Sequence, residues 1–404
     1  MKNRRQTVER NCRIAYGTMV DTIEMVNISK SIFSSAGANL LGGMKTATMS
    51  EDELLRHVTV LGFETLSKYL ANSQHGAILA IPHMGNWEIL ARMNPHFSRN
   101  RPCAVFFRPL NNPLMNDLVA RRREQSGTVL FSNKDGFTKA STHLRSGGLL
   151  GVLADQHAGR SGVDTPFFGR NTSCTPLIEI MHRRTSAAIF HVSVIRTAPA
   201  HWTIELRPHI ATTSSDTPAV MQGLEKSILR SPKDAFWFHN RWKIPQKRPF
   251  DLRQTRSSVF ASQQAKPWQV VVILSKDPSI RVAALPAVEK LAGQEPNYHF
   301  LILADEATFH AANVKWIPVQ NEQNLGATLR ELDIRSAAPL DLVLFFTTPD
   351  EQTDTSKTTK IPWSAGFSQK NSHTLSIRVP SPTTSFLEAS TWHHFIDALG
   401  SKAP

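Results

Sequence analysis

Short apolar runs alternate with helix-like segments along the first 210 residues, and this alternation limits the possible folds more than any other feature. The runs lie at 77–81, 104–107, 149–153, 187–195 and 202–206. Helical spacing of apolar residues marks 50–72, which Ser50 is expected to cap, and also 112–125, 136–146 and 175–184. Alternation of this kind predicts an α/β domain with a mixed sheet flanked by helices, in which strand ends carry the chemistry.

The alternation stops after residue 243. A polar, proline-containing tract runs to residue 266 and is typical of a linker. A second pattern then begins, with strands expected at 270–274, 299–303 and 341–346 and a helix near 281–293. The sequence therefore predicts a first domain of residues 1–245, a linker of 246–266, and a smaller Rossmann-like α/β domain of 267–404.

A histidine and a carboxylate, His83 and Glu88, follow the apolar run 77–81. In a continuous helix, five residues would place them about 140° apart, so they meet only if His83 lies in a turn before the helix. Asn86 is the expected N-cap. Glu88 can then accept the proton on one imidazole nitrogen, which leaves the other as a general base toward a substrate hydroxyl. The alternative is structural: His83 ends a strand, and Glu88 only favours the helix dipole.

Charge narrows the class of partner. Residues 1–265 contain 34 Lys and Arg against 19 Asp and Glu, whereas residues 266–404 contain 12 against 14. So basic a first part suits a membrane surface, an acidic carrier protein, phosphorylated lipids or nucleic acid. Nucleic acid is disfavoured because no zinc spacing, aromatic RNA-binding motif or recognition helix is evident. The three widely spaced cysteines argue against a disulfide framework and a thiolate metal site.

Polar islands follow the later strands as well. With 83–88, they make five ordered motifs, at 107–113, 153–159, 165–169 and 237–243. Together these motifs resemble the late acyltransferases of lipid A biosynthesis, the lauroyl and myristoyl transferases within the lysophospholipid acyltransferase superfamily. The resemblance covers roughly residues 4–245.

The resemblance implies acyl transfer from an acyl-thioester to a hydroxyl of a lipid A precursor or related glycolipid. Acyl carrier protein or coenzyme A would carry the acyl group as co-substrate, and no cofactor or metal is expected. His83 would remove the acceptor proton and Glu88 would orient the imidazole as a catalytic dyad. Arg108 matches a family arginine that holds phosphate or stabilises the oxyanion, with a structural ion pair as the alternative. Asp155 matches the aspartate of the family's Asp-Gln-Asp/Asn motif, and would pair with Arg108 or bind the acceptor.

Further substrate-binding residues are implied around these. They include Asn86 and Gln156, although the third position of the aspartate motif is His157, a departure from the family. Phe167 and Phe168 are expected beside the acyl or acceptor channel, with plain core packing as the alternative.

Membrane association is expected to be peripheral. No apolar run approaches the roughly 18 residues that span a bilayer, and the chain starts almost where the family's anchoring helix usually ends. We therefore expect it at the cytoplasmic face of the bacterial inner membrane, held by its basic surface. The apolar residues of 20–42 are expected in the core rather than on an interfacial helix. Arg241 and Lys243 either face anionic headgroups or are solvated.

The second domain resembles the N-terminal half of a heptosyltransferase-type glycosyltransferase over about 266–380. Ser279-Ile280 stands where that family has Gly-Asp, so the acidic catalytic residue is missing. We expect a non-catalytic module, or a domain that only packs and stabilises. Two rivals to the main hypothesis remain open: an acyltransferase acting on a lysophospholipid or other glycolipid, and a catalytically silent lipid-binding scaffold.

Overall fold

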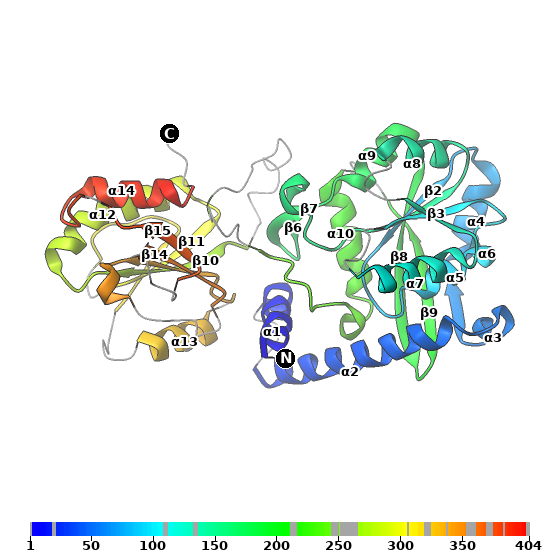
Figure 1. Ribbon diagram of the computed structural model, residues 1–404, viewed down its shortest axis with the longest axis horizontal. Coiled ribbons are helices and arrows are strands. Elements are labelled where there is room, and N and C mark those ends of the chain that lie inside the picture. Colours follow the sequence, from blue (N-terminus) through cyan, green and yellow to red (C-terminus); the bar gives the residue numbers. More distant parts are fainter. Residues whose placement is uncertain are drawn as a thin grey trace. The chain divides into compact units, whose positions relative to one another are not determined.

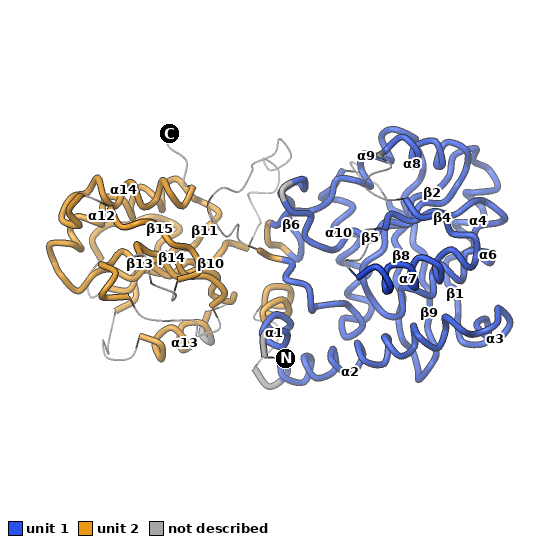
Figure 2. Tube along the Cα trace, in the orientation of Figure 1, with its two compact units in different colours: residues 1–9, 21–168, 172–241 blue, residues 10–20, 169–171, 242–404 orange. Residues whose placement is uncertain are grey.

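The computed structural model describes residues 2–17, 22–107, 112–131, 136–210, 216–243, 250, 266–304, 307–318, 325–336, 338–352, 361–368, 375–382 and 384–400. The chain divides into two compact units (Figure 2). Unit 1 comprises residues 1–9, 21–168 and 172–241, and unit 2 comprises residues 10–20, 169–171 and 242–404. Of the predicted linker 246–266, only Phe250 and Lys266 lie among the described residues.

Seven strands form the main sheet of unit 1, in the order β1-β9-β8-β2-β5-β3-β4 (Figure 1). All neighbours are parallel except β8 and β9, which are antiparallel, so the predicted mixed sheet is confirmed. The strands are β1 Val58–Leu61, β2 Ala77–Ile81, β3 Cys103–Phe106, β4 Thr128–Phe131, β5 Leu149–Leu153, β8 Ala188–Ala198 and β9 His201–Pro208. A separate two-stranded sheet pairs β6 Val163–Phe167 with β7 Arg170–Cys174.

Helices cover both faces of the seven-stranded sheet (Figure 1). They are α2 Thr22–Thr46, α3 Glu51–Leu55, α4 Phe63–Asn72, α5 Ile89–Arg92, α6 Asn94–Phe97, α7 Pro113–Glu124, α8 Gly136–Arg145, α9 Leu177–Thr185 and α10 Thr217–Ile228. Helix α1 Lys2–Tyr16 begins in unit 1 and continues in unit 2. Every residue of β2 is buried, as expected for a central parallel strand.

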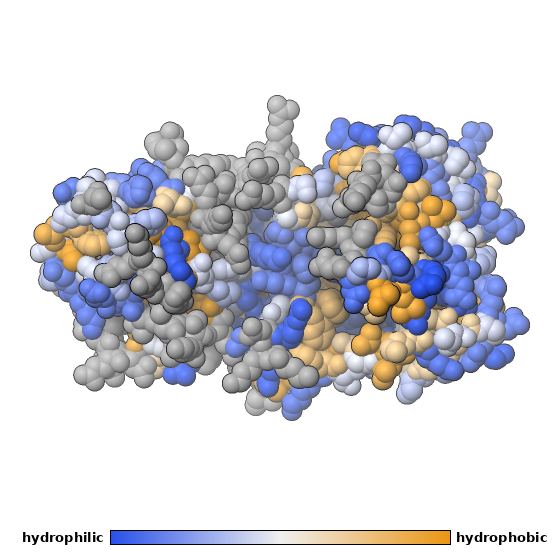
Figure 3. All heavy atoms as spheres, viewed as in Figure 1, coloured by the Kyte–Doolittle hydropathy of each residue, from blue (hydrophilic) through white to orange (hydrophobic). Residues whose placement is uncertain are grey.

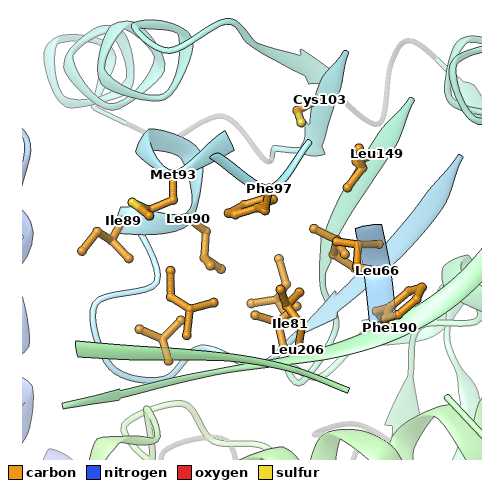
Figure 4. Close-up of a cluster of buried hydrophobic side chains, with 14 of the residues drawn as sticks. Leu66, Ile81, Ile89, Leu90, Met93, Phe97, Cys103, Leu149, Phe190 and Leu206 are labelled. Carbon is orange, nitrogen blue, oxygen red and sulfur yellow. The ribbon is translucent and has the colours of Figure 1, made fainter. Parts of the chain in front are cut away.

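The main hydrophobic core of unit 1 lies between the sheet and helices α4 to α6 (Figure 4). Strand side chains such as Ile81 and Leu149 meet Leu66 of α4, Leu90 of α5 and Phe97 of α6 there. Burying a side chain of this size stabilises the fold by about 1.5–3 kcal/mol. The sheet that carries the strand ends is therefore held rigidly.

The helix predicted over 50–72 is wrong. Ser50 does cap a helix, since its side chain accepts a hydrogen bond from the Glu53 amide, but α3 ends at Leu55. Residues Val58–Leu61 then form β1, which pairs with β9, and α4 follows. The β-branched residues of this stretch favour an edge strand once a partner strand is available.

Unit 2 is built on a six-stranded parallel sheet, in the order β12-β11-β10-β13-β14-β15. Numbered within the unit, this is 3-2-1-4-5-6, the order of a doubly wound Rossmann fold, so the predicted fold of this part is confirmed. The strands are β10 Trp268–Leu274, β11 Tyr298–Leu303, β12 Val314–Ile317, β13 Leu342–Phe346, β14 Trp363–Ser368 and β15 Ile377–Pro380. The helices are α12 Pro278–Gln294, α13 Leu325–Arg335 and α14 Ala389–Ala398.

Candidate active site

A histidine and an aspartate meet where two neighbouring strands end. Strands β2 and β5 are parallel, with Ile81 opposite Leu153, and His83 and Asp155 each lie two residues further along. The imidazole Nδ1 is 2.6 Å from Asp155 Oδ1, and the His83 amide donates to Asp155 Oδ2 at 3.0 Å. Both side chains are largely buried. The carboxylate thus holds both the ring and the backbone of His83.

The electrostatics of the pair favour an ionised carboxylate. Burial by itself would raise the pKa of Asp155, but the neighbouring His83, through its charge and hydrogen bonds, and Arg241 outweigh it and lower that pKa. An ionised Asp155 accepts the proton on Nδ1, which leaves Nε2 as the basic nitrogen. The Gln156 amide nitrogen lies 3.4 Å from Nε2. A residue predicted to bind substrate therefore adjoins the reactive nitrogen.

Glu88 has a different partner from the one predicted. Its carboxylate accepts two hydrogen bonds from Arg123 of α7, at 2.9 and 2.6 Å, and one from the Trp87 indole at 3.1 Å. The predicted hydrogen bond from the imidazole to Glu88 is corrected, because Asp155 occupies that position. The reason is geometric: α5 begins only at Ile89, and the bidentate pair with Arg123 directs Glu88 toward α7.

Asn86 ties the turn after β2 to helix α2. Its side chain is buried and donates to the Thr46 hydroxyl of α2 at 3.0 Å. It caps no helix, so that prediction is wrong, since Glu88 holds the N-cap position of α5. Gly85 has φ +59°, and a Cβ there would lie 2.1 Å from the Val194 carbonyl oxygen. Only glycine allows the turn to pack this closely against β8.

Residues 234–239 hold the same turn from the other side. The Gly85 amide donates to the Asp234 carbonyl, and the Phe236 amide donates to the His83 carbonyl, both at 2.8 Å. The His157 amide donates to His239 Nε2 at 3.2 Å, which ties down the loop after Asp155. Both halves of the histidine–aspartate pair are therefore anchored to this segment, of which only residues 237–239 belong to the motif predicted at 237–243.

Three of the remaining predicted residues, Phe167, Phe168 and Arg241, are buried. Phe167 and Phe168 are buried, with ring centroids 5.0 Å apart, and Phe168 packs on Trp237. Arg241 is neither solvated nor at the surface: it lies 4.8 Å over the Phe167 ring and donates to Thr172, Ser173 and Cys174. Lys243 is exposed, and Arg108 lies outside the described residues.

A narrow apolar pocket open to solvent lies close to the pair, although neither His83 nor Asp155 lines it. Trp87, Glu88 and Arg123 line one end, and the Trp87 ring meets the His83 ring edge-on at 5.2 Å. Phe97, Cys103 and Leu149 line the pocket near the opposite ends of the strands (Figure 4). The lining is mostly hydrocarbon, as in pockets that hold apolar ligands.

An α/β protein with a buried histidine–carboxylate pair at its strand ends, next to an apolar pocket, is equipped to deprotonate a hydroxyl beside a hydrocarbon chain. Comparison identifies the family: the chain belongs to the bacterial lipid A biosynthesis acyltransferases, whose family model matches residues 1–244. The resemblance inferred from the five motifs is thereby confirmed.

Individual relatives are more distant. The lipid A biosynthesis palmitoleoyltransferase of Escherichia coli (strain K12) is 29% identical over 152 residues, which cover 35% of this chain and 49% of the relative. The lipid A biosynthesis acyltransferase of Haemophilus influenzae is 23% identical over 212 residues (51% and 65%). A phosphatidylinositol mannoside acyltransferase of Mycobacterium tuberculosis is 25% identical over 211 residues (46% and 59%). The chain thus spans about half to two thirds of the length of these relatives.

Proposed function

We propose that this chain is an O-acyltransferase that moves a fatty acyl group from a thioester to a hydroxyl of a lipid A precursor or related glycolipid. The observation that carries the proposal is the His83–Asp155 pair, fixed at the strand ends and in contact with Trp87, which lines an apolar pocket. Family membership supports the acyl-transfer class.

In this mechanism Nε2 of His83 takes the proton of the acceptor hydroxyl, while Asp155 holds the ring and stabilises the imidazolium. The acceptor oxygen attacks the thioester carbonyl, and the carbon–sulfur bond breaks as the tetrahedral intermediate collapses. The departing sulfur takes the proton from the imidazolium, so the base is restored. A base of this kind contributes about 10²–10⁴ in rate.

The acyl chain of the donor would lie in the apolar pocket, with Phe97, Cys103 and Leu149 near its far end. Glu88 would act by holding Arg123 and Trp87 at the mouth, and Arg108 would bind phosphate or stabilise the oxyanion, as the family motif implies. Acyl carrier protein or coenzyme A would supply the thioester.

The acceptor is proposed as a glycolipid because the relatives' names specify lipid A and phosphatidylinositol mannoside. A lysophospholipid remains the rival within the enzyme class. A silent scaffold is disfavoured by the convergence of His83, Asp155 and Gln156 on one site beside a pocket, since a scaffold has no need of this arrangement.

We place the enzyme peripherally at the cytoplasmic face of the bacterial inner membrane, where such acceptors would be met. Among the described residues, no helix combines the length and apolar character needed to cross a bilayer.

Unit 2 is proposed as a non-catalytic module, related to one half of a glycosyltransferase.

The test is mass spectrometry of lipids from cells that produce the unmodified protein, His83→Ala, or the control His310→Ala, which changes an exposed histidine of unit 2. We expect one added acyl group per acceptor with the unmodified protein and the control, and none with His83→Ala. If the unmodified protein acylates no lipid, the enzyme proposal is wrong. If His83→Ala acylates equally well, His83 is not the base.

A further inference from the structure

Helix α2 is amphipathic in the reverse sense to an ordinary surface helix. The side that packs on unit 1 contains four buried polar residues, Ser29, Ser35, Asn39 and Thr46, besides Met25 and Ile32. Large apolar side chains point outward instead. A globular helix normally buries its apolar face, so the expectation that the apolar residues of 20–42 are core is wrong for most of the second half of α2.

Hydrogen bonds fix this orientation. The Asn39 side chain donates to Asp234 at 3.1 Å and accepts from the Trp202 indole at 3.2 Å. Further along, Thr46 accepts from Asn86 at 3.0 Å. Turning the helix over would leave these buried polar groups unpaired, at about 1–3 kcal/mol each. The outward apolar face is therefore built into the fold.

The outward face is a continuous stripe of Phe33, Leu40, Leu41 and Met44, at spacings of seven, eight and eleven residues from the first. Their exposed fractions are 39%, 69%, 67% and 56%. Gly37 lies within the same stripe, and a Cβ there would meet nothing within 4 Å. We call these residues the α2 stripe. Exposed Lys30 and Lys45 lie near its two ends.

A row of rings joins the α2 stripe to the catalytic histidine. Phe33 contacts Phe238 with centroids 4.9 Å apart, Phe238 contacts Phe236 at 5.2 Å, and Phe236 contacts Trp87 at 5.9 Å. Trp87 in turn meets His83 at 5.2 Å. Phe33 and Phe236 are each 39% exposed. Ring contacts thus run without interruption from α2 to the site.

Helix α7 has a similar character. Unlike the other long helices of unit 1, it buries none of its residues, and Leu114, Met115 and Leu118 are exposed. Its last turn carries Arg121, Arg122 and Arg123, and the last of these holds Glu88. Figure 3 shows apolar side chains over both α2 and α7 on the face that it presents. The two helices attach to neighbouring residues of the turn after β2.

We propose that the α2 stripe and the apolar residues of α7 dock unit 1 on an anionic lipid bilayer, and that the ring row conducts the acceptor lipid from the bilayer to His83. Apolar residues bordered by Lys and Arg are what an interfacial helix presents to anionic headgroups. The ring contacts join this surface to the proposed acyl-transfer site, which favours a bilayer over a second protein. The inference rests on the proposed function for its account of the acceptor, and its docking part is measured without any reaction.

The test is flotation of the full chain with vesicles of phosphatidylethanolamine and phosphatidylglycerol, and with vesicles of phosphatidylcholine alone. The variant is Leu40→Glu/Leu41→Glu, which changes only exposed positions. The control is Val282→Glu, since Val282 is 68% exposed on α12 of unit 2. We expect the unmodified protein and the control to bind anionic vesicles equally, and the double variant to bind at least tenfold more weakly. Binding to neutral vesicles should be weaker for all three.

Circular dichroism and sedimentation velocity accompany the flotation. Unchanged binding by a folded Leu40→Glu/Leu41→Glu variant would overturn the proposal, and so would a loss of self-association without a loss of vesicle binding, because the stripe would then join two copies of the chain. Phe236→Ser tests the conduction step: vesicle binding should persist while acylation of a vesicle-borne acceptor falls about tenfold. Failure of docking would leave the lipid analysis of His83→Ala unaffected, so the two proposals fail separately.

Discussion

Both units place a carboxylate beyond the end of a central parallel strand, but one carboxylate binds an imidazole and the other binds a hydroxyl and backbone amides. In unit 1, Asp155 follows β5 and binds the His83 imidazole, which leaves Nε2 as the basic nitrogen, and the same imidazole contacts Trp87 of an apolar pocket. In unit 2, Glu351 follows β13 and accepts from the Ser275 hydroxyl, the Lys276 amide and the Thr348 amide, at 2.8 to 3.1 Å. Asp155 holds the imidazole of a histidine, whereas Glu351 joins the loop after β10 to the loop after β13.

The helix after β10 shows the same contrast. Asp277 caps α12 by accepting from the Ser279 amide at 2.8 Å and from the Ile280 amide at 3.4 Å. In dinucleotide-binding Rossmann folds, a glycine-rich turn leaves such amides free for phosphate. Here two carboxylates of the chain fill the switch point between β10 and β13. Strand order therefore supplies the location of a site, whereas the side chains at the strand ends decide whether one exists.

The largest expected effect comes from changing Asp155, the carboxylate that holds His83 in unit 1. Asp155→Asn keeps the shape of the side chain but loses the charge that holds the imidazolium, so we expect kcat to fall about 10²–10⁴-fold with little change in KM. Steady-state kinetics with an acyl-thioester and a glycolipid acceptor measure this.

Glu88→Gln is the matched comparison. It should retain more kcat than Asp155→Asn and raise KM instead, since Glu88 binds Arg123 and Trp87 at the pocket mouth. If Glu88→Gln lowers kcat more than Asp155→Asn does, the dyad first expected from the sequence, His83 with Glu88, is the functional one.

Sequence reasoning located His83 and Asp155 because each follows an apolar run whose strand character is unambiguous. The pairing itself follows from adjacency of β2 and β5 and their register, which no local spacing reveals. Glu88 lies near His83 in sequence, but its partner Arg123 comes 35 residues later on another helix. Proximity along the chain therefore suggested the wrong contact.

The fold was predictable where burial and periodicity agree. The run 149–153 is strand β5 to the residue, and the strands of unit 2 expected at 270–274, 299–303 and 341–346 are found within two residues of those bounds. The failures involve partners distant in sequence: β1 exists because β9 pairs with it, and the polar side of α2 is buried because Trp202, Asp234 and Asn86 satisfy it. Tertiary contacts there outweigh local pattern.

The next effect concerns a buried carboxylate of unit 2 that has a purely structural role. Asp341 is fully buried and accepts from Arg10, from Arg170 at 2.9 and 3.0 Å, and from the Gln269 amide. Asp341→Ala leaves both guanidinium groups without their partner, so we expect unit 2 to lose about 3–5 kcal/mol of unfolding free energy. Denaturant unfolding measures the loss, and the exposed Asp350→Ala is the control.

Residues 10–20 and 169–171 belong to unit 2, so this cluster also bears on where the chain can be divided. A fragment ending at residue 245 would retain Arg10 and Arg170 without Asp341. Such a fragment should be less soluble or less stable than the full chain. Equal stability of the two would show that the buried ion cluster contributes nothing to the first part of the chain.

A smaller effect separates the two strand-end carboxylates. Glu351→Gln should cost unit 2 about 1.5–3 kcal/mol, because hydrogen bonds to an ionised carboxylate are replaced by weaker ones. Lipid acylation per folded molecule should stay unchanged, in contrast to Asp155→Asn. A loss of specific activity in Glu351→Gln would instead indicate that the switch point of unit 2 takes part in the reaction.

The smallest effect, over the range from pH 7.5 to 5, is a loss of stability of unit 1 in acid. His191 of β8 is buried, and its Nε2 lies 3.0 Å from Nδ1 of His209. Burial, together with the positive charges of His209, Arg207 and Lys226, lowers the pKa of His191 to about 3. An unfolded histidine binds its proton near pH 6.5, so unit 1 is at full stability above that pH and loses it as the pH falls toward 3. The slope is about 1 kcal/mol per pH unit within that window.

Denaturant unfolding at pH 7.5, 6 and 5 should show this dependence for unit 1, and His191→Leu should flatten it. His299→Leu in unit 2, where the ring is only partly buried, should leave the slope of unit 1 as it was; identical slopes for the unmodified protein and His191→Leu would mean that another group carries the acid sensitivity.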